Sequence, residues 1–103
     1  MSEPELTVGR GVIREMVRLA ALEVPGVARV GRGGPPWRAL TGRSVSARVR
    51  KDGVEVRVWI VARPGHPLVP LAAQVRSTVA ATVERLLGLE LRGVTILVDG
   101  VGG

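Results

Sequence analysis

The sequence predicts an α+β fold: a two-layer sandwich with two amphipathic helices on one face of a small, mostly antiparallel sheet of three to four strands. Residues 12–24 and 68–87 place apolar side chains every three or four positions, which is the helix period. Residues 45–50 and 54–62 alternate apolar and polar side chains on either side of Asp52-Gly53, which indicates a β-hairpin. These patterns predict the element order β-α-β-β-α-β.

Each element has a local reason. In residues 5–8, Leu6 and Val8 alternate with polar neighbours, which favours a short edge strand. The first helix ends at Pro25-Gly26, because proline disfavours helical geometry in the residue before it and Gly26 tolerates the turn. Residues 27–30 then favour a brief strand, and residues 31–43, rich in glycine, proline and arginine, predict an exposed loop.

The C-terminal half is predicted from two further patterns. The second helix, residues 68–87, ends before Gly88, a natural C-cap. Residues 94–98 alternate again and predict the last strand. We expect one domain over residues 1–103, with its core in residues 6–101 and the loop 31–43 exposed.

The hairpin register follows from its turn. With Asp52-Gly53 as a two-residue turn, Lys51 faces Val54. Every second residue of both strands is then apolar and falls on one face, namely Val45, Ala47, Val49, Val54, Val56, Val58, Ile60 and Ala62. On the other face this register sets Arg50 opposite Glu55 and Arg48 opposite Arg57. The last pair is unfavourable by itself, which suggests an anion or an acidic partner at that point.

Composition excludes several kinds of chemistry. The 103 residues contain no cysteine and one histidine, His66, which lies in a turn between Gly65 and Pro67. A metal site needs several convergent ligands, and no second histidine or cysteine can join His66. No serine lies in the G-x-S-x-G motif that presents a nucleophilic serine in hydrolases. We therefore expect no catalytic, cofactor-binding or metal-binding residues, no small-molecule substrate and no enzyme. No apolar run reaches the length of a membrane span, so a cytoplasmic location is expected.

Positive charge is concentrated in the middle of the chain. The net charge is +6, and nine of the 15 basic residues lie between Arg29 and Arg63, against two acidic ones, Asp52 and Glu55. A basic segment suggests a polyanionic neighbour, namely nucleic acid, an acidic protein or an anionic membrane surface. The alternative is that these arginines only solvate loops and a strand.

The outer face of the predicted sheet is the candidate interaction surface. Helices on one side leave the other side open, and exposed apolar groups there suggest association. The candidate partner-binding residues are Arg48, Arg50, Arg57, Trp59, Val61, Arg63 and Leu97. The alternative is that the loop or the N-terminal strand folds over the apolar members of this set.

A family resemblance adds to this interpretation. The run Ala20-Ala21-Leu22-Glu23-Val24-Pro25-Gly26-Val27, preceded by residues 12–17, resembles the signature helix of the alkaline shock protein family of envelope stress response proteins. The likeness continues through the hairpin, Leu86-Leu87-Gly88-Leu89 and the closing residues 94–98, and covers residues 6–101. It implies a small bacterial cytoplasmic protein linked to envelope and alkaline stress. Some members are held at the inner face of the membrane by an anchored partner. The family has no established reaction, so the resemblance implies no catalytic residues in this chain.

Two hypotheses follow. The first is a non-enzymatic stress response protein that oligomerises, or docks a protein partner, through its open sheet face. The second is a small nucleic-acid-binding module that uses the arginine-rich hairpin and loop. One observation speaks against this second hypothesis. Proteins that bind single-stranded nucleic acid stack the bases on several aromatic side chains, and this sequence offers one candidate.

Overall fold

The computed structural model describes residues 9–34, 44–88 and 90–102. In chain order they form α1 (Arg10–Leu22), β1 (Val27–Val30), β2 (Val45–Arg50), β3 (Gly53–Ala62), α3 (Leu68–Leu87) and β4 (Leu91–Val101). The predicted α+β class is confirmed, and the described order is α-β-β-β-α-β. The strand predicted at residues 5–8 lies outside the described residues, as does most of the loop 31–43.

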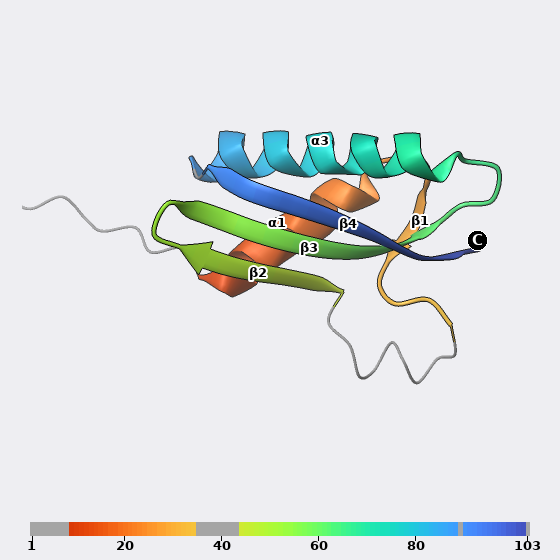
Figure 1. The fold of residues 1–103 in the computed structure, drawn as a ribbon, viewed down its shortest axis with the longest axis horizontal. Helices are drawn as coiled ribbons and strands as arrows, with labels where there is room; N and C mark the ends of the chain where they lie inside the picture. The colour runs from red at the N-terminus through yellow and green to blue at the C-terminus, as the bar shows by residue number, and fades with distance from the viewer. Residues whose placement is uncertain (1–8, 35–43, 89, 103) are drawn as a thin grey trace, which may run out of the picture.

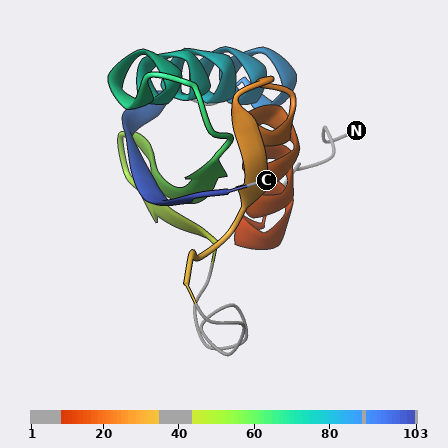
Figure 2. The same cartoon turned by 90° about the vertical axis from the view of Figure 1, so that its right-hand side faces the viewer.

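The sheet is built around β3. Antiparallel β1 and β2 pair with β3, β2 with residues 53–58 and β1 with residues 60–62, while β4 runs parallel to nearly the whole of β3. In Figure 1 the strands pass in front of α1, and α3 runs alongside β4. Figure 2 shows the sheet on one side, α1 on the other and α3 across the top. Neither described helix covers the other face of the sheet, which is called the helix-free or outer face below.

The core lies between this sheet and the two helices. Helix α1 packs against β1 and β2, and α3 packs against α1 and β4. The buried side chains are mostly β-branched or small, which suits strands and closely packed helices. They include Ile13, Val17, Ala20 and Ala21 of α1, Val54, Val56, Val58 and Ile60 of β3, and Leu71, Val75, Val79 and Val83 of α3.

Helix α3 has the predicted ends, whereas α1 ends at Leu22, before the predicted end at Pro25-Gly26. Gly9 is the N-cap of α1 and its carbonyl accepts a hydrogen bond from the Val12 amide. Gly88 caps α3 with φ of 66°, a left-handed conformation that glycine adopts without steric cost. The predicted bounds of the second helix, residues 68–87, are those of α3.

The hairpin register predicted from Asp52-Gly53 is wrong by two residues. Arg50 faces Gly53, Val49 faces Val54 and Arg48 faces Glu55, so the turn residues are Lys51 and Asp52. A two-residue shift leaves every side chain on its predicted face. It also removes the unfavourable pairing of Arg48 with Arg57, because each now faces Glu55 and Ser46 respectively.

The physical reason lies in the start of β4. The carbonyl of Glu90 accepts a hydrogen bond from the Val54 amide, at 3.0 Å between nitrogen and oxygen. A Cβ on Gly53, which has φ of +146°, would lie 2.7 Å from that carbonyl oxygen. Gly53 is thus needed inside the strand, where the chain from Glu90 passes close to it, rather than in the turn.

Gly26 is also needed for a different reason from the one predicted. It is not among the glycines with positive φ. A Cβ there would instead lie 2.7 Å from Cδ1 of Leu71 and 2.9 Å from Nδ1 of His66. Its carbonyl accepts a hydrogen bond from the Arg63 amide, which joins the end of β3 to the start of β1.

Replacing Gly26 by alanine is expected to lower the free energy of unfolding by about 1 kcal/mol, because the ends of two side chains must move to admit the methyl group. Urea unfolding followed by circular dichroism measures this loss. Gly11→Ala is the control, since Gly11 lies in α1 with only the Arg14 side chain near, at 3.9 Å. That change should stabilise the helix, and a gain in both variants would contradict the packing at Gly26.

Candidate functional site

The helix-free face of the sheet carries most of the residues predicted to bind a partner. Along β3 the side chains of Glu55, Arg57, Trp59 and Val61 alternate with the core residues and point to this outer face. Leu97 of β4 is opposite Trp59 in the register, and 36% of it is exposed. Trp59 is half-buried, so the aromatic ring and Leu97 form a small apolar area at the centre of the face.

The basic residues surround one end of that area. Arg48 and Arg57 are exposed and line a hollow of about 130 Å³ together with Ser46 and Glu55. Arg50, the next outward residue of β2, forms an ion pair with Glu55 at 3.2 Å between Nε and Oε2. Both side chains are nearly half exposed, so this pair contributes at most about 1 kcal/mol. Arg63 follows β3, is exposed, and lies beyond the strand pairing.

Val61 departs from its predicted exposure. Only 6% of it is accessible. A Cβ on Gly100 would lie 3.9 Å from its γ carbons, and Gly33 and Gly34 line the same depression. The beginning of the loop therefore covers this end of the face, as the alternative in the sequence analysis had it, and Val61 offers no surface to a partner.

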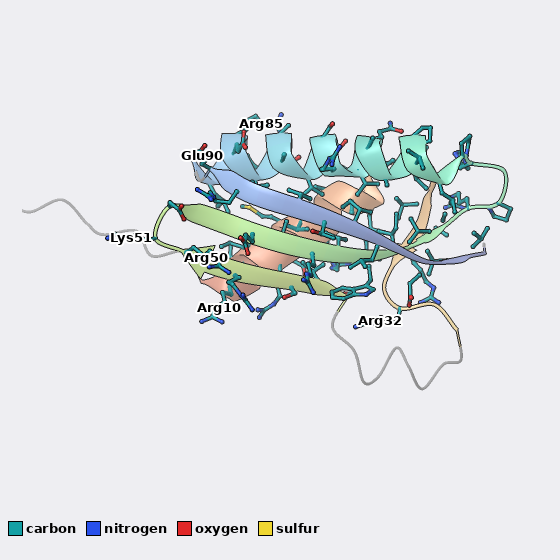
Figure 3. All side chains as sticks on the ribbon, viewed as in Figure 1. Arg10, Arg32, Arg50, Lys51, Arg85 and Glu90 are labelled. Carbon is teal, nitrogen blue, oxygen red and sulfur yellow. The ribbon has the colours of Figure 1, made fainter. Side chains whose placement is uncertain are left out.

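The covering segment also supplies a residue that was not in the predicted set. The guanidinium of Arg32 lies over the Trp59 ring, 4.2 Å from the ring centroid. Its Nε is buried without a hydrogen-bond partner among the described residues, which is consistent with a contact made to the aromatic face. Figure 3 places Arg32 and Arg50 at the β2 side of the molecule, and Arg85 on α3 at the opposite side. The only sequence signal for this contact was the position of Arg32 in a basic loop.

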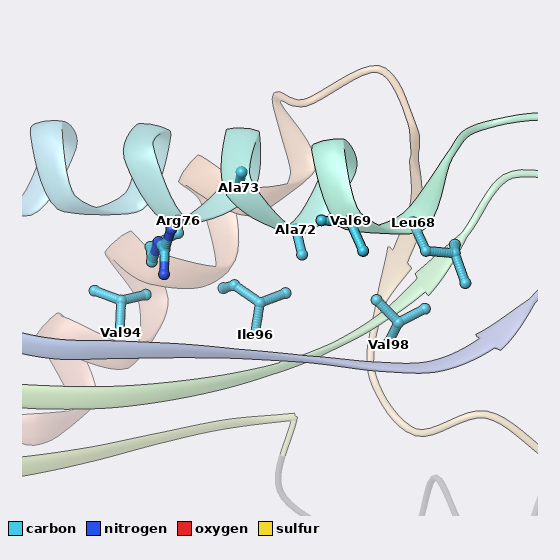
Figure 4. Close-up of a pocket in the computed structure, with 8 residues that line it drawn as sticks. All are labelled: Leu68, Val69, Ala72, Ala73, Arg76, Val94, Ile96 and Val98. Carbon is cyan, nitrogen blue, oxygen red and sulfur yellow. The ribbon is translucent and has the colours of Figure 1, made fainter.

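A second surface lies between α3 and β4. It is a groove of about 360 Å³ with an apolar lining, in which Val94, Ile96 and Val98 of β4 face Val69 and Ala72 of α3 (Figure 4). Val69 is 82% exposed at its mouth. The sequence patterns indicated buried apolar faces for both elements, and the groove shows where their packing is incomplete.

Chemical groups suited to metal binding are not gathered in the described part of the chain. Residues 9–34, 44–88 and 90–102 contain no cluster of three or more histidine, cysteine, aspartate or glutamate side chains that could hold a metal ion. His66 lies against Gly26 and is exposed. No described helix is long and apolar enough to cross a membrane.

Fold and surface together define a small α+β domain whose sheet has one helix-free face with an arginine-flanked tryptophan. The model of the alkaline shock protein 23 family, described as having a cell envelope-related function, matches residues 2–102. The chain belongs to this family. The resemblance inferred from residues 20–27 and the later elements is thereby confirmed.

Solved structures show the same fold at low sequence identity. The copper form of the MamM CTD has a TM-score of 0.65 and 15% identity, covering 88% of this chain and 85% of that one. A substituted MamM CTD in a zinc form has a TM-score of 0.61 and 15% identity, covering 87% and 84%. These similarities concern the fold alone. Among curated proteins, none matches the chain.

Proposed function

We propose that the chain is a non-enzymatic, envelope-related stress response protein that acts as a scaffold, associating with itself or with a protein partner through the outer sheet face. The observation that supports this most is the pair of Trp59 and Leu97 on a face without helices. Tryptophan and arginine are enriched among the residues that dominate binding energy at interfaces. Arg48, Arg50 and Arg57 would form the polar rim of such a contact.

Family membership supports the setting of this proposal. The family description is cell envelope-related. A protein of this kind would work in the cytoplasm, or at the inner face of the membrane through an anchored partner. Nucleic-acid binding, the second hypothesis, receives no support from the family, and Glu55 neutralises Arg50 within the basic hairpin.

Trp59→Ala is expected to abolish association. The ring is the largest apolar group on the outer face, and its removal also releases Arg32. Size-exclusion chromatography with light scattering should show an oligomer, or a complex with a captured partner, for the wild type and a monomer for the variant. Loss of an interface anchor of this kind typically weakens binding by 2 kcal/mol or more, or roughly thirtyfold.

Leu86→Ala is the matched control, since Leu86 is a large apolar residue 57% exposed on α3 rather than on the sheet. It should leave the mass unchanged. Leu97→Ser tests the same face without disturbing Arg32. The proposal fails if the wild type is a strict monomer that captures no partner, or if Leu86→Ala and Trp59→Ala have equal effects.

A further inference from the structure

The hollow on the outer face lies where β2 and β3 pair beside the hairpin. Ser46 is opposite Arg57, and Arg48 is opposite Glu55, so the two arginines occupy diagonal positions of one antiparallel ladder. Diagonal residues in such a ladder are about 7–8 Å apart at the backbone, within reach of long side chains. Two guanidinium groups can therefore converge on one small group seated over Ser46.

The charge of the hollow is unbalanced. Its one carboxylate, on Glu55, is engaged by Nε of Arg50 at 3.2 Å. Within the described residues, Arg48 and Arg57 have no acidic side chain within ion-pair distance. The four charged side chains at this site thus leave a surplus of two positive charges, beside the Ser46 hydroxyl. A bound anion would offset this surplus of positive charge.

The shape and the donors indicate which anion fits. Each guanidinium group can bind phosphate oxygens through two parallel N–H donors. The hydroxyl of Ser46 supplies one more hydrogen-bond donor. A hollow of about 130 Å³ is large enough for a tetrahedral phosphate group.

We propose that Ser46, Arg48 and Arg57 form a binding site for one phosphate group, presented as free phosphate or by a lipid headgroup. This inference rests on the proposed function, because it assigns the ligand chemistry of the same outer face. It adds a charged anchor beside the apolar contact at Trp59, and gives the unpaired arginines of the hairpin a role.

The test is an NMR titration of the arginine Nε–H signals with inorganic phosphate, at constant ionic strength maintained by chloride. We expect saturable shifts at Arg48 and Arg57 that chloride alone does not produce. Arg48→Gln should weaken the apparent affinity about tenfold. Arg85→Gln removes the same charge from the far side of the molecule (Figure 3) and should change it less than twofold, because exposed charges beyond about 8 Å are screened at physiological salt.

Binding to vesicles distinguishes a lipid headgroup from free phosphate as the source of the bound group. Co-sedimentation with vesicles of phosphatidylglycerol and phosphatidylcholine, but not of phosphatidylcholine alone, and its loss in Arg48→Gln, would assign a lipid headgroup. Phosphate shifts without co-sedimentation would assign free phosphate. Absence of saturable shifts at Arg48 and Arg57, or equal effects of the two substitutions, would overturn the site. So would tighter binding of a single-stranded oligonucleotide with a salt dependence of several phosphates, since one hollow holds one phosphate.

This outcome is separable from that of the proposed function. Arg48→Gln leaves Trp59 and Leu97 in place, and light scattering in chloride measures association without phosphate. Association that depends on Trp59 together with an absent phosphate response would refute the phosphate site and leave the scaffold. A phosphate response in a strictly monomeric chain that captures no partner would refute the scaffold and leave the phosphate site.

Discussion

Ile60→Ala is expected to lower the free energy of unfolding by about 3 kcal/mol, within the range that such truncations of buried isoleucine produce. Ile60 is fully buried in β3, the strand that pairs with all the others, and it lies opposite Val30 of β1 and Val98 of β4. Its removal leaves a cavity at the centre of the sheet, where neighbouring strands cannot collapse to fill it. Domains of this size are stable by roughly 5–15 kcal/mol, so the loss is a large share.

Urea unfolding followed by circular dichroism measures this effect, and the midpoint should fall without a change in the slope. Ile96→Ala is a matched control, because Ile96 is also an isoleucine on the helix side of the sheet but lines the open groove between α3 and β4. We expect it to cost about 1 kcal/mol, since less apolar area is buried there. Equal losses would mean that the groove is covered in solution and that Ile96 is as deeply buried as Ile60.

The elements could be predicted from the sequence because their causes are local. The bounds of α3 follow from a 3.6-residue period and from Gly88. The faces of β2 and β3 follow from the alternation of apolar and polar residues in 45–50 and 54–57. The pairing register could not be predicted in the same way. It depends on Glu90, which meets Val54 only after the chain has passed through α3. The two registers have the same pattern of faces, so alternation cannot choose between them.

The residues of the candidate surface also fall into two groups, those placed by local sequence patterns and those placed by tertiary contacts. Arg48, Arg57, Trp59 and Leu97 lie on the outer face because their parity along the strands places them there. The burial of Val61 and the contact of Arg32 with Trp59 depend on where residues 31–34 lie against the sheet. The loop has no periodicity that could reveal this path. Their positions come from a tertiary contact made by two glycines, Gly33 and Gly100.

That contact is tested by Gly33→Ala, which is expected to lower the free energy of unfolding by about 2 kcal/mol. The Gly33 amide donates a hydrogen bond to the Asp99 carboxylate at 2.8 Å. A Cβ on Gly33 would lie 1.9 Å from the Asp99 carbonyl oxygen and 3.3 Å from the Gly100 Cα. Because these are backbone atoms of β4, no rotation of a side chain can admit the methyl group, and the loop itself must move away.

Movement of the loop should displace Arg32 from Trp59 and expose Val61, so the variant has a second readout. The fluorescence of Trp59, recorded in a Trp37→Phe background, should change in wavelength or intensity when the guanidinium leaves the ring. Gly102→Ala is the control, since a Cβ at Gly102 meets no atom within 4 Å. It should alter neither stability nor fluorescence. A Gly33→Ala protein with unchanged stability and an unchanged Trp59 signal would show that the loop does not cover this end of the face, and Val61 would then join Trp59 and Leu97 as an exposed contact for a partner.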